Sequence, residues 1–194
     1  MNDFKPNKSP KQVFKLGAFG GTYFRPIESS ITGKKYTAKT VIKEYPKSWF
    51  QGIDIETMIT SSEYDKKVNK YGVKCGSSLE SWEQSGWIVK QDPYGWFQWY
   101  CRYYMGRRTK DDERQIKRWL ALAGPSGRFR RTLMNKIIKK NTRYNDYTVS
   151  PVIRQVLLHW GYELTSKDLE NYKKSLKNKP KKRSPKRRRS PKNQ

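Results

Sequence analysis

The densest apolar stretch of the chain runs from residue 92 to residue 108 and is dominated by aromatic side chains. Placed on a helix, these side chains cover almost the whole circumference, and only Gln98 and Arg102, four residues apart, form a polar stripe. A helix that is apolar on nearly every side is usually buried on every side. The pattern therefore predicts a central helix, capped by Asp92 at its start and closed by Gly106.

The same aromatic side chains, if exposed, would form a platform on which nucleobases stack. Large aromatic side chains are far more often core than ligand surface, so we favour the buried arrangement. Tyr103 and Tyr104 are the strongest candidates for exposure, because arginines adjoin them on both sides.

Apolar residues recur at helical spacing in six further segments, most of them bounded by a capping residue and a glycine. The predicted helices are 61–71, 77–84, 109–123, 128–140, 150–160 and 165–176. Ser77 with Glu80 and Thr165 with Asp168 have the spacing of capping boxes at the start of two of them. Near the N-terminus, β-branched and aromatic residues flank a Thr/Gly turn, which predicts a short hairpin with strands at 22–25 and 35–37. The expected fold class is mainly α (α+β): a compact bundle of about six short helices around the central aromatic helix, with a small N-terminal β-hairpin.

Composition divides the chain into three parts. Residues 1–15 are polar and contain two prolines, which predicts a flexible basic arm. Residues 16–172 carry the helical patterns and are expected to form a single globular DNA-binding domain. Residues 173–194 hold twelve Lys/Arg and no acid, which predicts a disordered tail.

The charge balance restricts the partners more than any other compositional feature. A formal net charge of +26 on 194 residues is costly to hold together unless a polyanion screens it. Nucleic acid is the expected partner, because neutralising phosphates releases counterions and supplies affinity without sequence specificity. An anionic membrane surface is the main competitor, although no run approaches the roughly 18 apolar residues of a membrane span.

Cysteine and histidine are too scarce for the common metal-binding and disulfide frameworks. Cys75, Cys101 and His159 cannot make a zinc finger, and we expect no metal and no cofactor. The chain opens with Met-Asn-Asp and lacks an apolar leader, so we expect no secretory signal. The expected compartment is reducing, either the nucleus or the cytoplasm.

Two of the predicted helices, 109–123 and 128–140, are joined by a four-residue turn that contains two glycines. This spacing is typical of a helix-turn-helix, whose second helix enters the major groove of DNA. Arginine reads guanine and asparagine reads adenine through paired hydrogen bonds. The residues placed to read bases are Arg128, Arg131, Asn135 and Lys139. An ordinary helical hairpin, basic on its outer face because the whole surface is basic, fits the same spacing.

Other cations of this region are expected to contact phosphates. Such contacts fix a protein on the duplex and supply affinity, but they carry no sequence information. The predicted phosphate contacts are Arg102, Arg107, Arg108, Arg114, Lys117, Arg118, Arg130, Lys136, Lys140, Arg143 and Arg154.

Beyond residue 178 the chain contains only Lys, Arg, Ser, Pro, Asn and Gln, with Ser-Pro-Lys at 184–186 and again at 190–192. This unit resembles the Ser-Pro-Lys/Arg repeats of histone and linker-histone tails, a likeness that implies binding in narrow A·T-rich minor grooves. The tail cations expected to contact DNA are Lys181, Lys182, Arg183, Lys186, Arg187, Arg188, Arg189 and Lys192. A nuclear-localisation signal fits the same basic run, and a merely solubilising tail is the alternative.

A catalytic role finds little support in the residue pattern. Asp111, Asp112 and Glu113 form the single acidic cluster, and the metals of nucleases need converging carboxylates. These acids open a predicted helix, where the dipole favours negative charge without any metal. His159 is expected to be a packed or surface histidine and Cys75 a small core residue, so we expect a non-enzymatic protein.

Four motifs carry a resemblance to a known family. They are Tyr71-Gly-Val-Lys-Cys-Gly-Ser-Ser-Leu-Glu80, Asp92-Pro-Tyr-Gly-Trp-Phe-Gln-Trp-Tyr-Cys-Arg102, Asp112-Glu-Arg-Gln-Ile-Lys-Arg-Trp119 and Ser150-Pro-Val-Ile-Arg-Gln155. Together, across residues 20–164, they resemble a domain found in proteins of large DNA viruses, such as the marseilleviruses and chlorella viruses, and in some algae and protists. The resemblance implies a viral, DNA-associated role in the virion or the host nucleus, and it assigns no catalytic residue.

The sequence thus predicts a non-enzymatic double-stranded DNA-binding protein with a basic face and two basic arms, acting in packaging or transcription. Two rival hypotheses stay open. One is an RNA-binding protein that stacks bases on exposed aromatic side chains. The other is a protein–protein adaptor within a virion, to which the tails give general adhesion.

Overall fold

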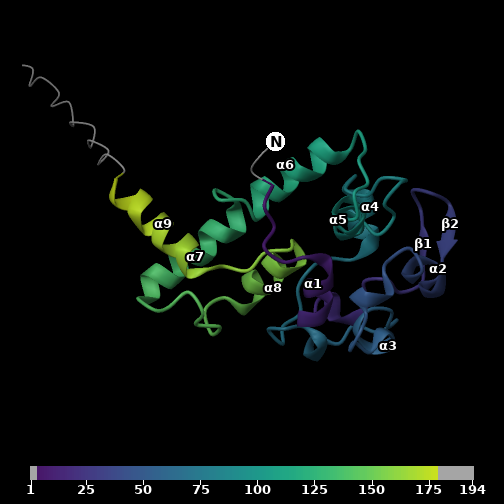
Figure 1. Cartoon of the computed structure of the whole chain (residues 1–194), viewed down its shortest axis with the longest axis horizontal. Helices are drawn as coiled ribbons and strands as arrows, with labels where there is room; N and C mark the ends of the chain where they lie inside the picture. The colour runs from purple at the N-terminus through teal and green to yellow at the C-terminus, as the bar shows by residue number, and fades with distance from the viewer. Residues whose placement is uncertain (1–3, 179–194) are drawn as a thin grey trace, which may run out of the picture.

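The computed structural model describes residues 4–178, and within that span the chain forms nine α-helices and one two-stranded antiparallel sheet. The helices are α1 (Pro10–Leu16), α2 (Ala38–Ile42), α3 (Ile55–Met58), α4 (Leu79–Gln84), α5 (Trp96–Tyr104), α6 (Asp112–Leu122), α7 (Arg128–Lys140), α8 (Pro151–His159) and α9 (Ser166–Lys177). The remaining elements are the strands β1 (Ile27–Ser29) and β2 (Lys34–Tyr36) and the 3-10 turns η1 (Phe19–Gly21), η2 (Lys47–Trp49) and η3 (Lys66–Val68). The mainly helical class with a small hairpin is confirmed, although α1, α2 and α3 were not predicted. In Figure 1 the hairpin lies at one end of the molecule and α9 at the other.

Helix α5 is the buried centre that the hydrophobic pattern predicted. Every residue from Trp96 to Cys101 is buried. The predicted cap is wrong: Gly95, with a φ of 85°, precedes the helix. This φ lies in the left-handed region, so the position requires glycine; a Cβ there would also lie 2.9 Å from Ile88 Cδ1, the end of a side chain that would have to shift. The carboxylate of Asp92 binds two arginines instead of the helix start.

The first residues belong to the fold, and the predicted flexible arm over residues 1–15 is wrong from Phe4 onward. Ser9 caps α1: its hydroxyl accepts a hydrogen bond from the Gln12 N–H (3.3 Å), and the Gln12 side chain accepts one from the Ser9 N–H (2.8 Å). The Phe4 ring packs edge-on against Trp119, with 5.2 Å between ring centroids. A polar segment therefore folds because its few apolar side chains reach the aromatic core.

The hairpin forms downstream of the predicted first strand. In the observed register Ile27 of β1 lies opposite Tyr36 of β2. Pro26 has no N–H to donate to a ladder, and the segment before it turns inward instead of forming a strand. Tyr23 in that segment is buried, and its hydroxyl donates a hydrogen bond to the Tyr94 carbonyl (2.7 Å).

The helix predicted between Ser61 and Tyr71 does not form, and only the short turn η3 is helical there. The segment is held instead by Asn69, which is buried. The Asn69 side chain accepts a hydrogen bond from the Gly20 N–H (2.8 Å) and donates one to the Val73 carbonyl (2.7 Å). These tertiary hydrogen bonds take the place of helical ones, and the local sequence pattern carries no sign of them.

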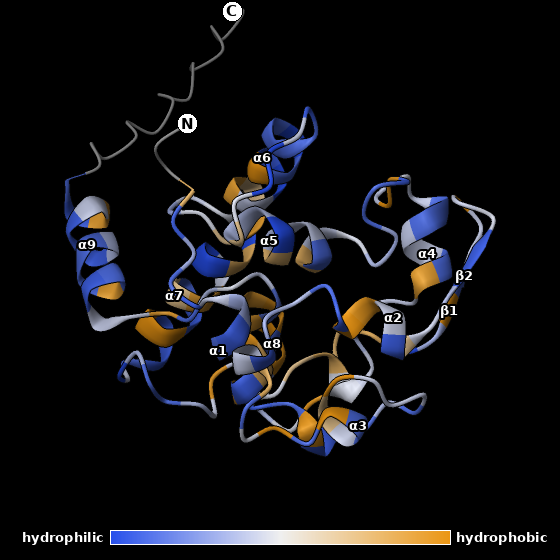
Figure 2. Cartoon of the chain, turned by 45° about the vertical axis from the view of Figure 1, so that its right-hand side comes forward, coloured by the Kyte–Doolittle hydropathy of each residue, from blue (hydrophilic) through white to orange (hydrophobic). Residues whose placement is uncertain are grey.

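The C-terminal half follows the sequence prediction closely. α7 has the predicted bounds, and α6, α8 and α9 begin within a few residues of the predicted starts. Thr165 and Asp168 form the predicted capping box of α9, whose Leu169 is buried against the core. The boundary predicted after residue 172 falls inside this helix, which continues to Lys177. In Figure 2 α9 is mostly hydrophilic and α8 mostly hydrophobic, as expected for an outer and an inner helix.

Candidate nucleic-acid interface

Arg102 and Arg107, both predicted to contact phosphates, form an internal ion-pair cluster. They bind the completely buried carboxylate of Asp92 at 3.0 and 2.6 Å, and Arg102 also pairs with Glu44 at 2.5 Å. Burial is the largest single influence on the pKa of Arg102 and lowers it, but the hydrogen bond to Glu44 and the charges of the neighbouring Glu44 and Asp92 together outweigh burial, so the net effect raises the pKa. Both arginines bind Asp92, which precedes α5, and so connect the segment before this helix with its last turn and the residues after it. This structural role differs from the predicted phosphate contact.

Arg154 and Arg130 are also used inside the fold. Arg154 is 4% exposed, and its guanidinium donates to three backbone carbonyls between residues 144 and 149 at 2.8–3.0 Å. It closes the loop between α7 and α8, and the predicted DNA contact is wrong because no polyanion can reach it. Arg130 forms an ion pair with Asp168 and so ties α7 to α9.

Two further predicted phosphate contacts lie in ion pairs on α6. Arg114 pairs with Asp111 at 2.5 Å, and Lys117 pairs with Glu113 at 2.6 Å. Burial is the largest single influence on the pKa of Asp111 and raises it, but the hydrogen bonds from Arg114 and Gln115 and the charges of Arg114 and Arg118 together outweigh burial and leave the pKa lowered. The Lys117–Glu113 pair is fully on the surface, where such pairs contribute little, so Lys117 can exchange its partner for a phosphate.

The acidic cluster at the start of α6 does not converge on one point. Asp111 and Glu113 face the cations of their own helix. Asp112 accepts hydrogen bonds from the Trp99 indole (2.8 Å) and from the Thr109 hydroxyl (3.0 Å). Among residues 4–178, no group of three or more His, Cys, Asp or Glu side chains is arranged to hold a metal ion. The acids therefore serve as caps and ion-pair partners.

Helix α7 and the turn after it carry cations that lack acidic partners. Residues 128–143 contain seven Lys/Arg and no Asp or Glu. Within the described part of the chain, only Arg130 and Lys140 of these seven come within 4.0 Å of a carboxylate oxygen. The other five are all exposed: Arg128, Arg131, Lys136, Lys139 and Arg143.

Helix α9 lies beside α7 (Figure 1) and adds to this charge. Besides the Arg130–Asp168 ion pair, the Tyr172 hydroxyl donates a hydrogen bond to Asn135 Oδ1 at 2.8 Å. That bond engages the oxygen on which the predicted reading of adenine depends. We define the α7–α9 surface as the exposed cations of the two helices and the turn after α7 that have no carboxylate partner among the described residues: Arg128, Arg131, Lys136, Lys139, Arg143, Lys167, Lys173, Lys174 and Lys177.

Arg118 of α6 is half-buried, and no carboxylate of residues 4–178 lies within ion-pair distance of it, a property that it shares with Arg25 and not with the half-buried Arg102, Arg107, Arg114 and Arg130. Its guanidinium lies 5.5 Å from the Trp87 ring and 5.6 Å from the Trp160 ring, and it donates to the Gln115 side chain at 3.0 Å. Burial and the charge of Arg114 lower the pKa of Arg118 to about 10. An anion placed against this poorly compensated charge would be stabilised.

The two tyrosines predicted to be exposed differ in their surroundings. Tyr104 is 55% exposed. Tyr103 is half-buried, and the exposed guanidinium of Arg108 lies 3.8 Å from the centre of its ring. Arg108 therefore keeps an outward charge, whereas one face of the Tyr103 ring is already covered.

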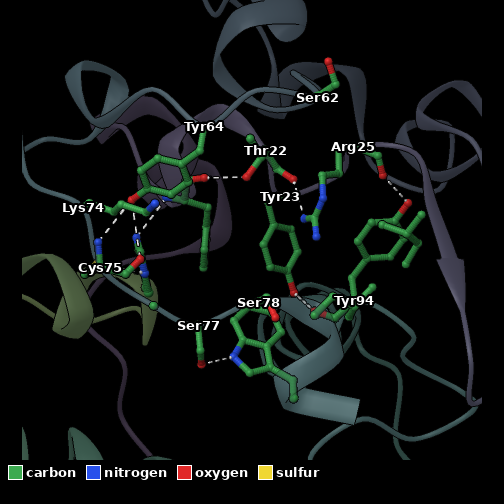
Figure 3. A pocket seen from close by; sticks show the side chains of 16 residues that line it. Thr22, Tyr23, Arg25, Ser62, Tyr64, Lys74, Cys75, Ser77, Ser78 and Tyr94 are labelled. Atoms are coloured by element: carbon green, nitrogen blue, oxygen red, sulfur yellow. Dashed lines mark hydrogen bonds between the residues drawn. The ribbon is translucent and has the colours of Figure 1, made fainter. Parts of the chain in front are cut away.

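An aromatic cleft adjoins α6 and α7, and the sequence prediction missed it. The cleft has two lobes, of about 450 and 430 Å³, which share Phe19, Trp82 and His159 among their lining residues. Arg25 lines the first lobe, shown in Figure 3, and Arg118 lines the second. No Asp or Glu lines either lobe. We call these the Arg25 lobe and the Arg118 lobe of the aromatic cleft.

The aromatic side chains that line the cleft are held in place by hydrogen bonds of their own indole N–H and hydroxyl groups. The Trp82 indole donates to the Ser77 hydroxyl (2.9 Å), and the Tyr23 hydroxyl donates to the Tyr94 carbonyl (Figure 3). Ser77 is free for this contact because Ser78, one residue later than predicted, caps α4. With their polar edges satisfied, the rings present apolar faces to the cavity.

Phe19, between the two lobes, has an unusual backbone conformation. Its φ of 58° is rare for a residue with a side chain, and such strain concentrates at ligand sites. The Phe19 ring stacks on His159 with 4.0 Å between centroids, and the Phe19 N–H donates to His159 Nε2 at 2.9 Å. The tertiary structure thus holds a strained residue that fixes one aromatic face at the centre of the cleft.

The same contacts determine the state of the neighbouring thiol. Because Nε2 of His159 accepts a hydrogen bond, the imidazole proton lies on Nδ1, which faces the Cys75 sulfur at 3.7 Å. Burial lowers the pKa of His159 to about 3 and raises the pKa of Cys75 to about 12. The pair is a neutral imidazole beside a protonated thiol, an arrangement in which His159 cannot accept the thiol proton at Nδ1.

The tail cations predicted to contact DNA, from Lys181 to Lys192, lie outside the described residues. No helix within residues 4–178 combines the length and the apolar character that crossing a membrane requires. Comparison with protein-family models, with curated proteins and with solved structures found no match to this chain. The assignment of function therefore depends on the geometry of the site.

Proposed function

We propose that this protein binds double-stranded DNA, holding backbone phosphates on the α7–α9 surface, and that it catalyses no reaction. The observation that carries the proposal is the uncompensated charge of α7 and the turn after it, where five exposed cations have no acidic partner in the described structure. Separation of these cations from acids is costly unless phosphates neutralise them. Release of the counterions that phosphates carry would supply the affinity.

The arrangement favours backbone contacts over base reading. α9 flanks α7, and the Asn135 oxygen already accepts the Tyr172 hydroxyl. Arg128 and Arg131 are the exposed residues of α7 best suited to bases, because arginine pairs with guanine. We therefore propose an architectural or packaging role, with any groove reading limited to these two arginines. The resemblance of four sequence motifs to a domain of large DNA viruses supports DNA as the polyanion and the virion or host nucleus as the setting.

The test is a salt titration of duplex affinity with the full-length chain. The variant replaces Arg131, Lys136 and Lys139 together by Gln. For every phosphate that the variant no longer neutralises, the slope of log affinity against log salt should become shallower by about 0.9. The measurement is fluorescence anisotropy of a labelled duplex at several salt concentrations. The matched control replaces Lys34 of β2, Lys39 of α2 and Lys43 at the end of α2, exposed cations of elements that lie at the opposite end of the molecule from α9 (Figure 1).

Three outcomes would contradict the proposal. Equal slopes for the two triple variants would show that affinity follows total charge and not the α7–α9 surface. Loss of nearly all affinity when the nine Lys/Arg beyond residue 178 are replaced by Gln would assign binding to the tail. Tighter binding of duplex RNA than of duplex DNA would favour the RNA-binding rival.

Groove reading is tested separately. The double variant Arg128→Ala/Arg131→Ala should lower any preference among duplex sequences if these residues contact base edges. A preference that is unchanged, with affinity lowered equally for all sequences, would assign both arginines to phosphates.

A further inference from the structure

The Arg118 lobe of the aromatic cleft differs from an ordinary packing defect in its lining. Its volume of about 430 Å³ lies within the roughly 300–1,000 Å³ of small-molecule sites. Several tryptophan rings face it, and Trp87 is 45% exposed, so the lobe reaches the surface. Closely packed interiors do not leave openings of this size between large rings.

The charge of the lobe indicates the ligand class. Arg118 and Arg128 both line it, and no acid does. The Arg118 guanidinium is held between Trp87 and Trp160 and has no carboxylate partner within residues 4–178. A ligand that suits this lobe therefore combines a flat aromatic part with a negative charge. A nucleotide has both, because its base has a π-face and its phosphate is anionic.

The lobe is also continuous with the α7–α9 surface. Arg128 lines the lobe and is the first residue of α7, and Phe129 beside it lines the lobe as well. A strand whose phosphates follow α7 would therefore reach the cleft at the start of this helix. A paired base could not enter, because its edges and faces are occupied within the duplex.

We propose that the Arg118 lobe binds an unpaired nucleotide of a DNA strand, the base against the tryptophan rings and the phosphate against Arg118 and Arg128. The proposal rests on the proposed DNA binding of the α7–α9 surface and adds a second, base-occupied site to it. The ligand follows from the chemistry of the lining: planar rings, two cations and no acid. The Arg25 lobe, which shares part of the wall, takes no part in this assignment.

The experiment compares a blunt duplex with the same duplex carrying an unpaired extension, using the full-length protein. Stacking of one base contributes roughly 1–3 kcal/mol, so the extension should raise affinity by at least about five-fold. Trp87→Ala should remove this gain while leaving blunt-duplex affinity unchanged, and Arg118→Gln should remove the gain as well. Trp87 is partly exposed, so its replacement spares the core. Tyr147→Ala, which removes a 53% exposed ring that lines neither lobe, is the control and should keep the gain.

A second arm tests the two parts of the ligand. Deoxyadenylate should quench tryptophan fluorescence more strongly at low concentration than deoxyadenosine, because only the former carries the phosphate. Arg118→Lys should keep part of this difference, since it retains the charge but not the planar guanidinium. Equal binding of the two compounds would overturn the role of Arg118, and binding of neither would overturn the site.

Failure of this proposal differs from failure of the DNA-binding proposal. No gain from the extension, with the salt slope still dependent on Arg131, Lys136 and Lys139, would remove the cleft site alone. A gain that survives Trp87→Ala would place the unpaired strand elsewhere and overturn the assignment. A gain that disappears in Trp87→Ala, with no salt-slope change in the triple variant, would support the cleft and overturn the α7–α9 surface.

Discussion

The two ends of α5 and the exposed side of α7 use the same residue type for opposite purposes. At α5, Arg102 and Arg107 surround one buried carboxylate and are absorbed into the fold. On α7, Arg128 and Arg131 have no acid in reach within the described residues and stay outside. The sequence alone does not distinguish Arg102 and Arg107 from Arg128 and Arg131. All four lie in or just after a predicted helix with apolar residues, in a chain that is basic throughout.

The difference shows that a cation is held inside the fold where the tertiary structure supplies acceptors for it, the Asp92 carboxylate for Arg102 and Arg107 or the three loop carbonyls for Arg154. A buried charge is tolerated only when it is paired and hydrogen-bonded, so Asp92 requires the arginines as much as they require it. Among the described residues, α7 packs no buried carboxylate against its exposed arginines and lysines, so these cations remain accessible to a polyanion. Four measurements test this division between inner and outer cations.

The largest expected effect is that of Asp92→Asn. The substitution leaves two half-buried guanidinium groups without their shared anion, and we expect it to lower the free energy of unfolding by about 3–5 kcal/mol. Urea unfolding followed by tryptophan fluorescence measures this. Unchanged stability together with tighter duplex binding would show that Arg102 and Arg107 face outward. The distinction between these inner arginines and the outer cations of α7 would then be wrong.

Arg154→Met comes next. Three carbonyls between residues 144 and 149 lose their donor, and we expect a loss of about 2–4 kcal/mol. Hydrogen exchange in the loop between α7 and α8 should become faster at the same time. Arg143→Met, an exposed arginine of the same loop, is the matched control and should change neither quantity. Equal effects of the two variants would refute the division between inner and outer arginines.

The third measurement is the free energy of unfolding as a function of pH, which tests His159, a buried titratable side chain without an ion-pair partner in the described part of the chain. Burial lowers the folded pKa of His159 to about 3, below its unfolded value of 6.5, so the unfolded chain binds the extra proton between these values. Stability is therefore full above pH 6.5 and falls as the pH decreases, by about 2 kcal/mol at pH 5. His159→Gln should flatten this part of the profile, and an unchanged slope would mean that other groups produce it.

The smallest effect is expected for Glu113→Gln. Its pair with Lys117 is exposed on both sides, so the unfolding midpoint should stay within experimental error. Duplex affinity should rise slightly, because Lys117 gains a free charge. A clear loss of stability would show that surface pairs of α6 matter as much as the cluster at Asp92.

Much of the fold could be predicted from the sequence because its signals are local. The apolar spacing of α7 predicted its bounds, and Thr165 with Asp168 marked the start of α9. The burial of α5 followed from aromatic side chains on nearly every side of the helix. Phe4 was missed because a contact with a distant part of the core holds it. Helix α1 was missed although it carries local signals, the capping box of Ser9 with Gln12 and Pro10 at the first helical position.

The site was less predictable than the fold. The sequence identified the basic character of α7, but it grouped Arg154 and Arg102 with the exposed cations. The partner of Arg102, Glu44, is 58 residues away in the sequence. The backbone carbonyls that Arg154 binds converge on it only in the folded loop between α7 and α8, and backbone groups leave no mark in the residue pattern. The aromatic cleft was missed for the same reason, because Phe19, Trp82 and Arg118 lie on separate elements with no common spacing.

The helical periods, the aromatic centre and the excess of positive charge follow from the order of amino acids alone. Which of those charges are neutralised within the protein, and where rings enclose a cavity, follows from the packing of the folded chain. The two kinds of information differ in range. Periodicity and capping act within a few residues, whereas ion pairing and cavity formation depend on which distant segments the core brings together.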